Sequence, residues 1–411
     1  MMHDLLFILY TWVVRIGNIY VFIGSFFSDK IGKLNKGRQD VWKKLENIHH
    51  GSGPVTWIHC ASLGEFEQGR PLIEMLRVKY PDSHIALSFF SPSGYELQKG
   101  YEFADTIFYL PSDMPENAKK IISKLNPKIV IFVKYEFWWN LIRSLTERDI
   151  PVFLISAVFR QKDYFFRPFF APFLDLLKNY RMIFVQDKNS SDTLKHYQIN
   201  NHMITGDTRI DRVLERSKEP IVDKKIKEYC HNKTVIVYGS VWQSDMQIVE
   251  KSIKRFPDFI HIIAPHDISN QNIKKLCSMI SSDSWLYSDT DWHSNVLIIN
   301  NIGMLGSLYA VAKYAYIGGG FGNGIHNILE PAVFGIPVFF GPEHKKFNEA
   351  VILSNEKIAF AINRQNEMIH IIANLEKSGI EYQNITEKAA DFFSGNMGAT
   401  EKTASFLYTY L

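Results

Sequence analysis

The stretch YIGGGFGNGIHNILEPAVFGIPVFFGP, residues 316–342, is the most informative part of this chain. It contains the end of an apolar strand, a run of glycines at 318–324 and a second apolar strand at 336–340. Between them, residues 326–331 are typical of a helix start, with Glu330 in the first turn. Glycine lets a backbone approach a phosphate closely, a helix N-terminus favours an anion, and a first-turn carboxylate can accept ribose hydroxyls. The pattern predicts a nucleotide site; a structural turn with a capped helix is the alternative.

The composition indicates a soluble, packed body without a disulfide framework. The chain has 411 residues, 46% of them hydrophobic and 14% aromatic, which allows two to three domains with large cores. The net charge of +3 is too small to predict binding to nucleic acid. The three cysteines, Cys60, Cys230 and Cys277, are far apart and form no C-x-x-C pair. Such spacing fits a reducing compartment and argues against a cysteine-rich zinc site.

The first 45 residues differ from the rest of the chain. The stretch from Leu5 to Phe27 is mostly apolar, interrupted by Arg15 and Asn18, and a bilayer core takes about 20 helical residues. A basic cluster follows it, which predicts a cytoplasmic flank: Lys30, Lys33, Lys36, Arg38, Lys43 and Lys44. We expect residues 1–45 to form a membrane anchor. A spanning helix, an interfacial helix and a buried core helix remain open.

Beyond residue 45, short apolar runs alternate with helical patterns. Strands are expected at 56–60, 85–89, 129–133, 152–156, 182–186, 203–206, 234–239, 261–264, 296–299, 314–317 and 336–340. This alternation predicts an α/β fold with parallel sheets covered on both faces. The number of strands predicts two such domains, at 46–214 and 215–411, with the charged stretch 215–227 as the linker.

Glu65 marks a second possible site in the first domain. It lies where the loop Ser62-Leu63-Gly64 after an apolar strand meets a helix predicted at 67–79. Ligands of parallel sheets bind beyond the carboxyl ends of the strands. Glu65 is therefore either a general base or a carboxylate that the helix dipole stabilises, and its position alone leaves both roles open.

Four motifs together narrow the function. They are HCASLGE at 59–65 with RPLI at 70–73, YEFWWNL at 135–141, TGDTRID at 205–211, and the glycine-rich stretch at 318–342. In this order they resemble the Kdo transferases of lipopolysaccharide synthesis, which add 3-deoxy-D-manno-octulosonic acid (Kdo) to the lipid A precursor. The resemblance covers nearly the whole chain and includes an N-terminal anchor.

The resemblance implies a GT-B type glycosyltransferase, with two Rossmann-like domains facing a central cleft and an N-terminal membrane helix. It implies transfer from CMP-Kdo to the lipid A precursor with inversion, at the cytoplasmic side of the inner membrane. Glu65 would be the general base, and Glu136 and Arg209 would stabilise charge in the transition state. The resemblance implies no metal and no cofactor. The CMP contacts that it implies are Pro265, His266, Ile302, Gly303, Met304, Asn327, Ile328, Leu329 and Glu330.

The chain departs from the family pattern at several positions. Pro265 is not followed by the usual arginine, and Arg209 replaces a lysine, which keeps the charge but changes the donor geometry. Lys134 stands where an acidic residue is common, and Trp139 replaces a proline. Three alternatives stay open: another GT-B nucleotide-sugar transferase acting on a membrane lipid, a nucleotide-sugar epimerase of the same fold, and a non-catalytic membrane scaffold.

Overall fold

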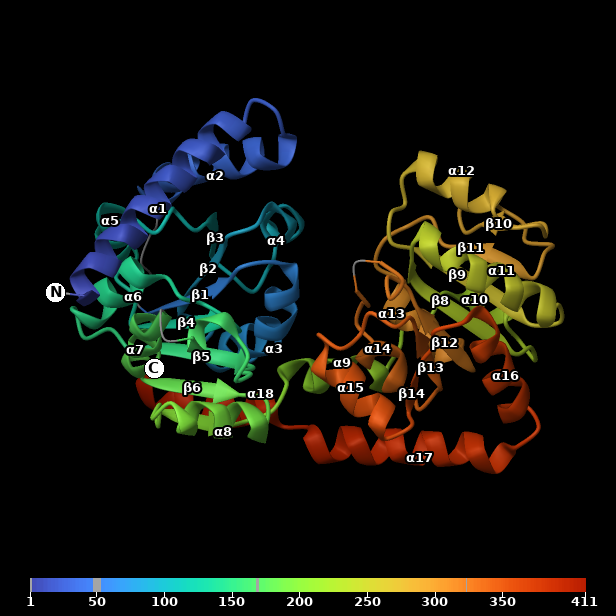
Figure 1. Cartoon of the computed structure of the whole chain (residues 1–411). Helices are drawn as coiled ribbons and strands as arrows, with labels where there is room; N and C mark the ends of the chain where they lie inside the picture. The colour runs from blue at the N-terminus through green and yellow to red at the C-terminus, as the bar shows by residue number, and fades with distance from the viewer. Residues whose placement is uncertain (1, 47–52, 168–169, 323) are drawn as a thin grey trace. The chain divides into compact units, whose positions relative to one another are not determined.

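The computed structural model describes residues 2–46, 53–167, 170–322 and 324–411. The chain divides into two compact units (Figure 1). The N-terminal unit contains residues 1–211 together with 396–411, and the C-terminal unit contains residues 212–395.

The N-terminal unit is built on a parallel sheet of seven described strands in the order β3-β2-β1-β4-β5-β6-β7. The strands are β1 (Val55–Cys60), β2 (His84–Phe89), β3 (Thr106–Tyr109), β4 (Ile129–Val133), β5 (Val152–Ala157), β6 (Met182–Val185) and β7 (His202–Ile204). The helices are α1 (Met2–Gly24), α2 (Asp29–Glu46), α3 (Leu63–Lys79), α4 (Pro92–Gln98), α5 (Pro115–Leu125), α6 (Trp139–Thr146), η1 (Tyr164–Phe166), α7 (Ala171–Asn179), α8 (Lys188–His196), α18 (Ala399–Leu407) and η5 (Tyr408–Tyr410). Helix α9 (Thr208–Lys218) begins in this unit and continues into the C-terminal unit.

Apolar side chains fill both faces of this sheet, as the unbroken hydrophobic strands predict. In β1, Trp57 packs into one core cluster with α5 and α6, whereas Ile58 and Cys60 pack into a second cluster with α3 and α18. Helix α18 therefore completes the N-terminal unit from the far end of the chain. Asp211 stabilises this return, because its carboxylate accepts hydrogen bonds from the N–H groups of Gly398 (2.6 Å) and Thr400 (2.7 Å).

The C-terminal unit has the same architecture, with described strands in the order β10-β11-β9-β8-β12-β13-β14. The strands are β8 (Val235–Val241), β9 (Ile260–Pro265), β10 (Trp285–Leu286), β11 (Val296–Ile298), β12 (Tyr314–Ile317), β13 (Val338–Phe340) and β14 (Ala359–Ala361). The helices are α10 (Lys224–Tyr229), η3 (Gln243–Asp245), α11 (Met246–Arg255), α12 (Asn270–Ser278), α13 (Leu305–Leu308), η4 (Tyr309–Val311), α14 (Leu329–Ala332), α15 (Asn348–Asn355), α16 (Gln365–Leu375) and α17 (Gly379–Asn396).

The two parallel sheets confirm the predicted fold class, and every predicted strand is present within a few residues. Strands β3, β10 and β14 were not predicted. The predicted linker at 215–227 is largely helical, since α9 ends in it and α10 begins in it. Among the described residues, one helical stretch, Leu6–Gly24, is long and apolar enough to cross a membrane, with a mean hydropathy of 1.7.

Candidate active site

The structure brings two of the predicted catalytic carboxylates to neighbouring strand ends. Glu65 lies in the first turn of α3, directly after β1, and Glu136 lies between β4 and α6. Strands β1 and β4 pair in parallel, so both loops leave the same edge of the sheet. The negative charge of Glu65 also contributes to the pKa of Glu136, which places the two carboxyl groups in one electrostatic environment.

Glu136 is buried, with 4% of its surface exposed. Burial raises its pKa well above the usual range; the hydrogen bond from the Trp138 indole N–H opposes this rise, and the charge of Glu65 adds to it. The His59 Nε2 atom lies 3.7 Å from Glu136 Oε2, but burial lowers the pKa of His59 to about 3. The imidazole is therefore neutral near pH 7, and the two side chains do not form an ion pair.

Glu65 has a different environment. It is only partly buried, and its carboxylate accepts a hydrogen bond from the Ser62 hydroxyl. Its place in the first turn of α3 favours a negative charge. Two neighbouring carboxyl groups in such unlike environments can divide the work, because the more solvated one can accept a proton while the buried acid donates a hydrogen bond.

Arg209, the third predicted catalytic residue, is held by an ion pair. Its Nε lies 3.1 and 3.0 Å from the two carboxylate oxygens of Asp207, and a terminal nitrogen lies 2.6 Å from one of them. The preceding Thr208 hydroxyl donates to the backbone oxygen of Gln68 at 2.6 Å. Because Gln68 is on α3, one turn beyond Glu65, this bond ties the start of α9 to the helix that carries the predicted base.

Sequence reasoning assigned no role to the residues that surround Glu136. The Tyr180 hydroxyl donates to the backbone oxygen of Glu136 at 2.7 Å. Ser88 Oγ lies 2.8 Å from His59 Nδ1 and accepts from the Trp57 indole at 2.8 Å. The sequence signal that could have identified them is the presence of polar residues inside otherwise apolar strands, since a buried polar group requires a hydrogen-bond partner.

In the C-terminal unit, the glycine run after β12 satisfies much of its own hydrogen bonding. The Gly318 amide donates to the oxygen of Gly239 (2.8 Å), and the amides of Gly322 and Gly324 both donate to the oxygen of Gly319 (3.0 Å). The Gly319 amide, at a residue with φ of +91°, donates to the Asp245 carboxylate at 3.0 Å. These amides point into the fold, so the predicted phosphate cradle is much smaller than the glycine count suggests.

Close packing explains another glycine of the run. A Cβ on Gly320 would lie 2.5 Å from the backbone nitrogen of Gly341 in the loop after β13. In the part of the chain that the structure describes, the amides of Gly320 and Phe321 have no acceptor. Among the described residues of the run, these two amides remain available to an anion.

The buried Asp245 organises this loop and was missed from the sequence. Its carboxylate accepts from the N–H groups of Trp242 (2.8 Å) and Gly319 (3.0 Å) and from the Tyr316 hydroxyl (2.7 Å). It thereby joins the loop after β8 to the loop after β12.

The helix predicted at 326–331 is shorter than expected. Helix α14 begins at Leu329 and has four residues, because residues 326–328 are not helical. Asn327 Oδ1 already accepts the Leu329 amide at 3.1 Å. The predicted helix start at 326 is therefore wrong, whereas Glu330 does lie in the first turn.

Glu330 and Gly303 line a cavity of about 470 Å³ in the C-terminal unit. Asn327 donates to Glu330 at 3.3 Å, and Arg216 of α9 lines the same cavity. Burial raises the pKa of Glu330, while the nearby guanidinium groups of Arg216 and Arg212 oppose that rise. The cavity combines a carboxylate, a cation and glycine backbone, which suits a nucleoside ribose and phosphate.

His266 belongs to an aromatic stack at the carboxyl ends of β8 and β9. Its ring lies 4.2 Å from that of Trp242 and 4.6 Å from that of His326. Burial lowers the pKa of His266, and burial together with His266 lowers that of His326 to about 4. Both imidazoles are therefore neutral near pH 7 and offer ring faces and single N–H groups rather than charge.

The other residues predicted to contact CMP differ in how exposed their side chains are. Ile302 is 79% exposed and precedes Gly303, and Met304 accepts a hydrogen bond from the Asn301 amide. Pro265 ends β9. The side chains of Ile328 and Leu329 are fully buried, so these two residues can offer a ligand only backbone atoms.

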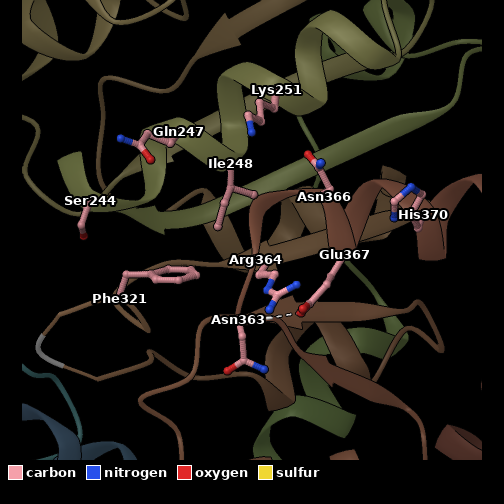
Figure 2. Close-up of a pocket in the computed structure, with 10 residues that line it drawn as sticks. All are labelled: Ser244, Gln247, Ile248, Lys251, Phe321, Asn363, Arg364, Asn366, Glu367 and His370. Carbon is pink, nitrogen blue, oxygen red and sulfur yellow. Dashed lines mark hydrogen bonds between the residues drawn. The ribbon is translucent and has the colours of Figure 1, made fainter.

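A larger cavity, of about 600 Å³, lies elsewhere in the C-terminal unit and contains none of the predicted site residues. Figure 2 shows that side chains of α11 and α16 line it, with Phe321 of the glycine loop at one end. Among the described residues, no group of three or more His, Cys, Asp or Glu side chains is placed to hold a metal ion.

Comparison with known proteins agrees with the motifs. Residues 33–212 match the family model described as 3-deoxy-D-manno-octulosonic-acid transferase (kdotransferase). A protein of that name from Chlamydia muridarum is 27% identical over 379 residues, covering 87% of this chain and 86% of its own length. Another from Aquifex aeolicus is 27% identical over 340 residues, covering 80% and 88%. The chain is therefore similar to Kdo transferases over most of its length. A Kdo transferase of Haemophilus influenzae extends the match at 22% identity over 86% of the chain and 87% of the relative.

Solved structures similar to this chain show a GT-B type fold. A UDP-GlcNAc 2-epimerase from Neisseria meningitidis aligns with a TM-score of 0.64 at 16% identity, over 87% of this chain and all of the other. MurG from Acinetobacter baumannii aligns with a TM-score of 0.53 at 12% identity, over 87% and 99%. At these identities the likeness concerns the fold alone.

Proposed function

We propose that this chain transfers Kdo from CMP-Kdo to the lipid A precursor, with inversion at the sugar centre. The pair Glu65 and Glu136, at neighbouring strand ends of a chain that is similar to Kdo transferases over most of its length, carries the proposal. One of the two carboxyl groups is partly solvated and can accept a proton from a hydroxyl, and the other is buried with a raised pKa and can donate a hydrogen bond.

Glu65 acts as the general base in this mechanism. Its carboxylate takes the proton of the acceptor hydroxyl, and the freed oxygen forms a bond to the anomeric carbon of Kdo. The bond between that carbon and the phosphate oxygen breaks, and CMP leaves with the electron pair. A positioned base contributes about 10²–10⁴-fold to such a step. No enzyme nucleophile is required, since the displacement occurs in one step.

Glu136 works as a hydrogen-bond donor in this scheme. As a buried carboxylic acid, beside a neutral His59 and the Trp138 indole, it can donate its proton to an oxygen that gains negative charge. Arg209, oriented by Asp207, supplies positive charge near the start of α9. A preorganised cation requires little rearrangement at the moment of reaction.

The C-terminal unit binds the CMP part of the donor. The Glu330 carboxylate accepts the ribose hydroxyls in the cavity that Gly303 lines, and Arg216 provides a cation for the phosphate there. This cation offsets the arginine that is missing after Pro265. His266 contributes a ring face for the base, as part of the stack with Trp242.

The lipid acceptor explains the apolar N-terminal helix. A lipid A precursor is anchored in a membrane by its acyl chains, so the enzyme has to work at a membrane surface. The stretch Leu6–Gly24 supplies the apolar surface for this attachment, and lysines follow it in α2. We place the protein at the cytoplasmic side of the inner membrane, where CMP-activated sugars are available.

Nucleotide binding separates this function from that of another GT-B enzyme. Isothermal titration of the full-length protein in detergent should show CMP binding at least about tenfold tighter than UDP binding, and Glu330→Gln should weaken it by about tenfold because a charge-assisted bond to the ribose is lost. Tighter binding of UDP would move the assignment to a UDP-sugar transferase. If Kdo were transferred to another acceptor and not to the lipid A precursor, the assignment of CMP-Kdo as donor would stand and that of the acceptor would be wrong.

A further inference from the structure

Helix α1 has two faces of different character. Its partly buried side chains recur at helical spacing and include Phe7, Tyr10, Val14 and Asn18. The side chains between them are exposed and mostly apolar. This pattern describes a helix that lies against the protein along one side and meets its surroundings along the other.

The partly buried face is held by two polar contacts, just over two helical turns apart. The Tyr10 hydroxyl donates to the Asp113 carboxylate at 2.6 Å, and the Asn18 amide donates to the Ser112 hydroxyl at 3.0 Å. Asp113 is itself 5% exposed and also accepts the backbone N–H groups of Asn140 and Leu141. The latch, as we name the Tyr10–Asp113 and Asn18–Ser112 pairs, therefore reaches into the core of the N-terminal unit.

Ring packing extends the same contact. The Phe7 and Tyr10 rings lie 6.1 and 5.8 Å from that of Trp139, and the Arg143 guanidinium lies 5.0 Å from the Phe7 ring. Trp139 begins α6, directly after Trp138, the donor to Glu136. The helix thus docks on the same short segment that positions the buried catalytic acid.

The opposite face is apolar and has a basic continuation. Its large exposed side chains are Ile8, Leu9, Trp12, Val13, Ile16, Ile19, Tyr20, Phe22 and Ile23, followed by Phe26 and Phe27 at the turn into α2. Arg15 is also exposed, with its guanidinium 5.2 Å from the Trp12 ring. The exposed lysines of α2 are Lys30, Lys33, Lys36, Lys43 and Lys44. An apolar stripe with adjacent lysines complements an anionic phospholipid surface.

From these contacts we propose that α1 is an interfacial helix. It lies in the plane of one leaflet of an anionic bilayer, held against the N-terminal unit by the latch, and it does not cross the membrane. A crossing helix would be surrounded by lipid, which would break both latch pairs and remove the hydroxyl donor of the buried Asp113. Arg15 would also enter the hydrocarbon, whereas at an interface its long side chain can reach the headgroups.

This inference rests on the proposed membrane attachment and makes it specific. Because α1 packs on Trp139, three residues after Glu136, the leaflet would lie close to the catalytic acid of the N-terminal unit. A glycolipid acceptor could then present its sugar to the site while its acyl chains stay in the leaflet.

Protease accessibility of two terminal tags tests the proposal on the full-length protein. One epitope tag precedes Met1 and another follows Leu411, and both are probed in intact spheroplasts and in inverted inner-membrane vesicles. An interfacial helix predicts that both tags are cleaved in inverted vesicles and that both are protected in spheroplasts. Cleavage of the N-terminal tag in spheroplasts alone would mean that α1 crosses the membrane and would overturn the proposal. A protein that fails to float with vesicles would overturn the membrane attachment itself.

The latch has a matched control on the same helix. Tyr10→Phe removes only the hydroxyl that Asp113 accepts, whereas Tyr20→Phe removes a hydroxyl from an exposed residue. With vesicles of three parts phosphatidylethanolamine to one part phosphatidylglycerol, hydrogen exchange at the amides of Asn140 and Leu141 should rise about three- to tenfold in Tyr10→Phe. In Tyr20→Phe it should stay within about twofold. Equal exchange in both variants would show that α1 does not remain docked at the membrane.

Discussion

Asp245 offers a sharp test of how the C-terminal unit holds its glycine loop. It is fully buried, and its carboxylate accepts three hydrogen bonds, from the Trp242 and Gly319 amides and the Tyr316 hydroxyl. Asp245→Ala leaves all three donors without their acceptor. A hydrogen bond to a charged group contributes about 1.5–3 kcal/mol.

The expected loss is smaller than the sum of three such bonds. Burial raises the pKa of Asp245, which shows that desolvation of the carboxylate opposes its hydrogen bonds, and the alanine variant is relieved of that cost. We therefore expect Asp245→Ala to destabilise the loop by about 3–5 kcal/mol. Asp245→Asn keeps one acceptor oxygen, and its amide can donate to the Tyr316 oxygen, so its cost should be about 1–2 kcal/mol.

Hydrogen exchange at individual amides measures this effect where it occurs. Exchange at the Trp242 and Gly319 amides should accelerate about 5- to 30-fold in Asp245→Asn and by more than 100-fold in Asp245→Ala, since 1.4 kcal/mol corresponds to a factor of about ten. Asp258→Ala, at an exposed carboxylate of the same unit, is the control and should leave both amides unchanged. Exchange in Asp245→Ala within about threefold of the wild type would refute the assigned role.

Three further predictions concern other buried groups. Glu136→Gln should keep kcat within about tenfold of the wild type, because the amide can replace the carboxylic acid as hydrogen-bond donor. Glu136→Ala should lower kcat by about 100-fold, and steady-state transfer kinetics distinguish the two variants. Asp211→Ala should lower the free energy of unfolding by about 1–3 kcal/mol in urea titrations, because two amides at the start of α18 lose their acceptor, and equal stability would contradict that reading. Burial lowers the pKa of His261 to about 4, so the unfolded chain takes up this proton first and stability is lost as the pH falls from about 6.5 towards 4. In His261→Gln, the free energy of unfolding should fall less steeply with pH, by up to about 1.4 kcal/mol per pH unit. Urea unfolding at pH 7 and pH 5 measures this difference.

The fold could be predicted because its central strands are buried on both faces. Strands such as β4 and β13 are unbroken apolar runs, and such runs between helical patterns indicate parallel sheets. Strands β3, β10 and β14 are short and lie at or near sheet edges, where mixed character is tolerated, so their sequences resemble loops. The return of α18 to the N-terminal unit was also hidden, since an amphipathic helix does not specify the surface on which it packs.

The site could be predicted only in part, for a related reason. Glu65 and Glu136 follow predicted strands, but the pairing of β1 with β4 that brings them together is a property of the topology. Glycines signal close approach without identifying what approaches, and Gly320 meets the backbone of Gly341. The role of Asp245 depends on neighbours that are distant in sequence, such as Tyr316. Motifs therefore indicated where the site lies, while its hydrogen bonding required the structure.

The most direct test of the proposed reaction is transfer from CMP-Kdo to a purified tetra-acylated lipid A precursor in detergent, read by mass spectrometry. Wild type and Glu65→Gln are compared under equal conditions, and CMP binding and thermal unfolding confirm that the variant is folded. We predict that the wild type adds one or more Kdo units and that Glu65→Gln forms product at least about 100-fold more slowly, with CMP affinity unchanged. Product formation by Glu65→Gln within about threefold of the wild type would contradict the role of Glu65 as base, and the absence of product with wild type would contradict the proposed reaction.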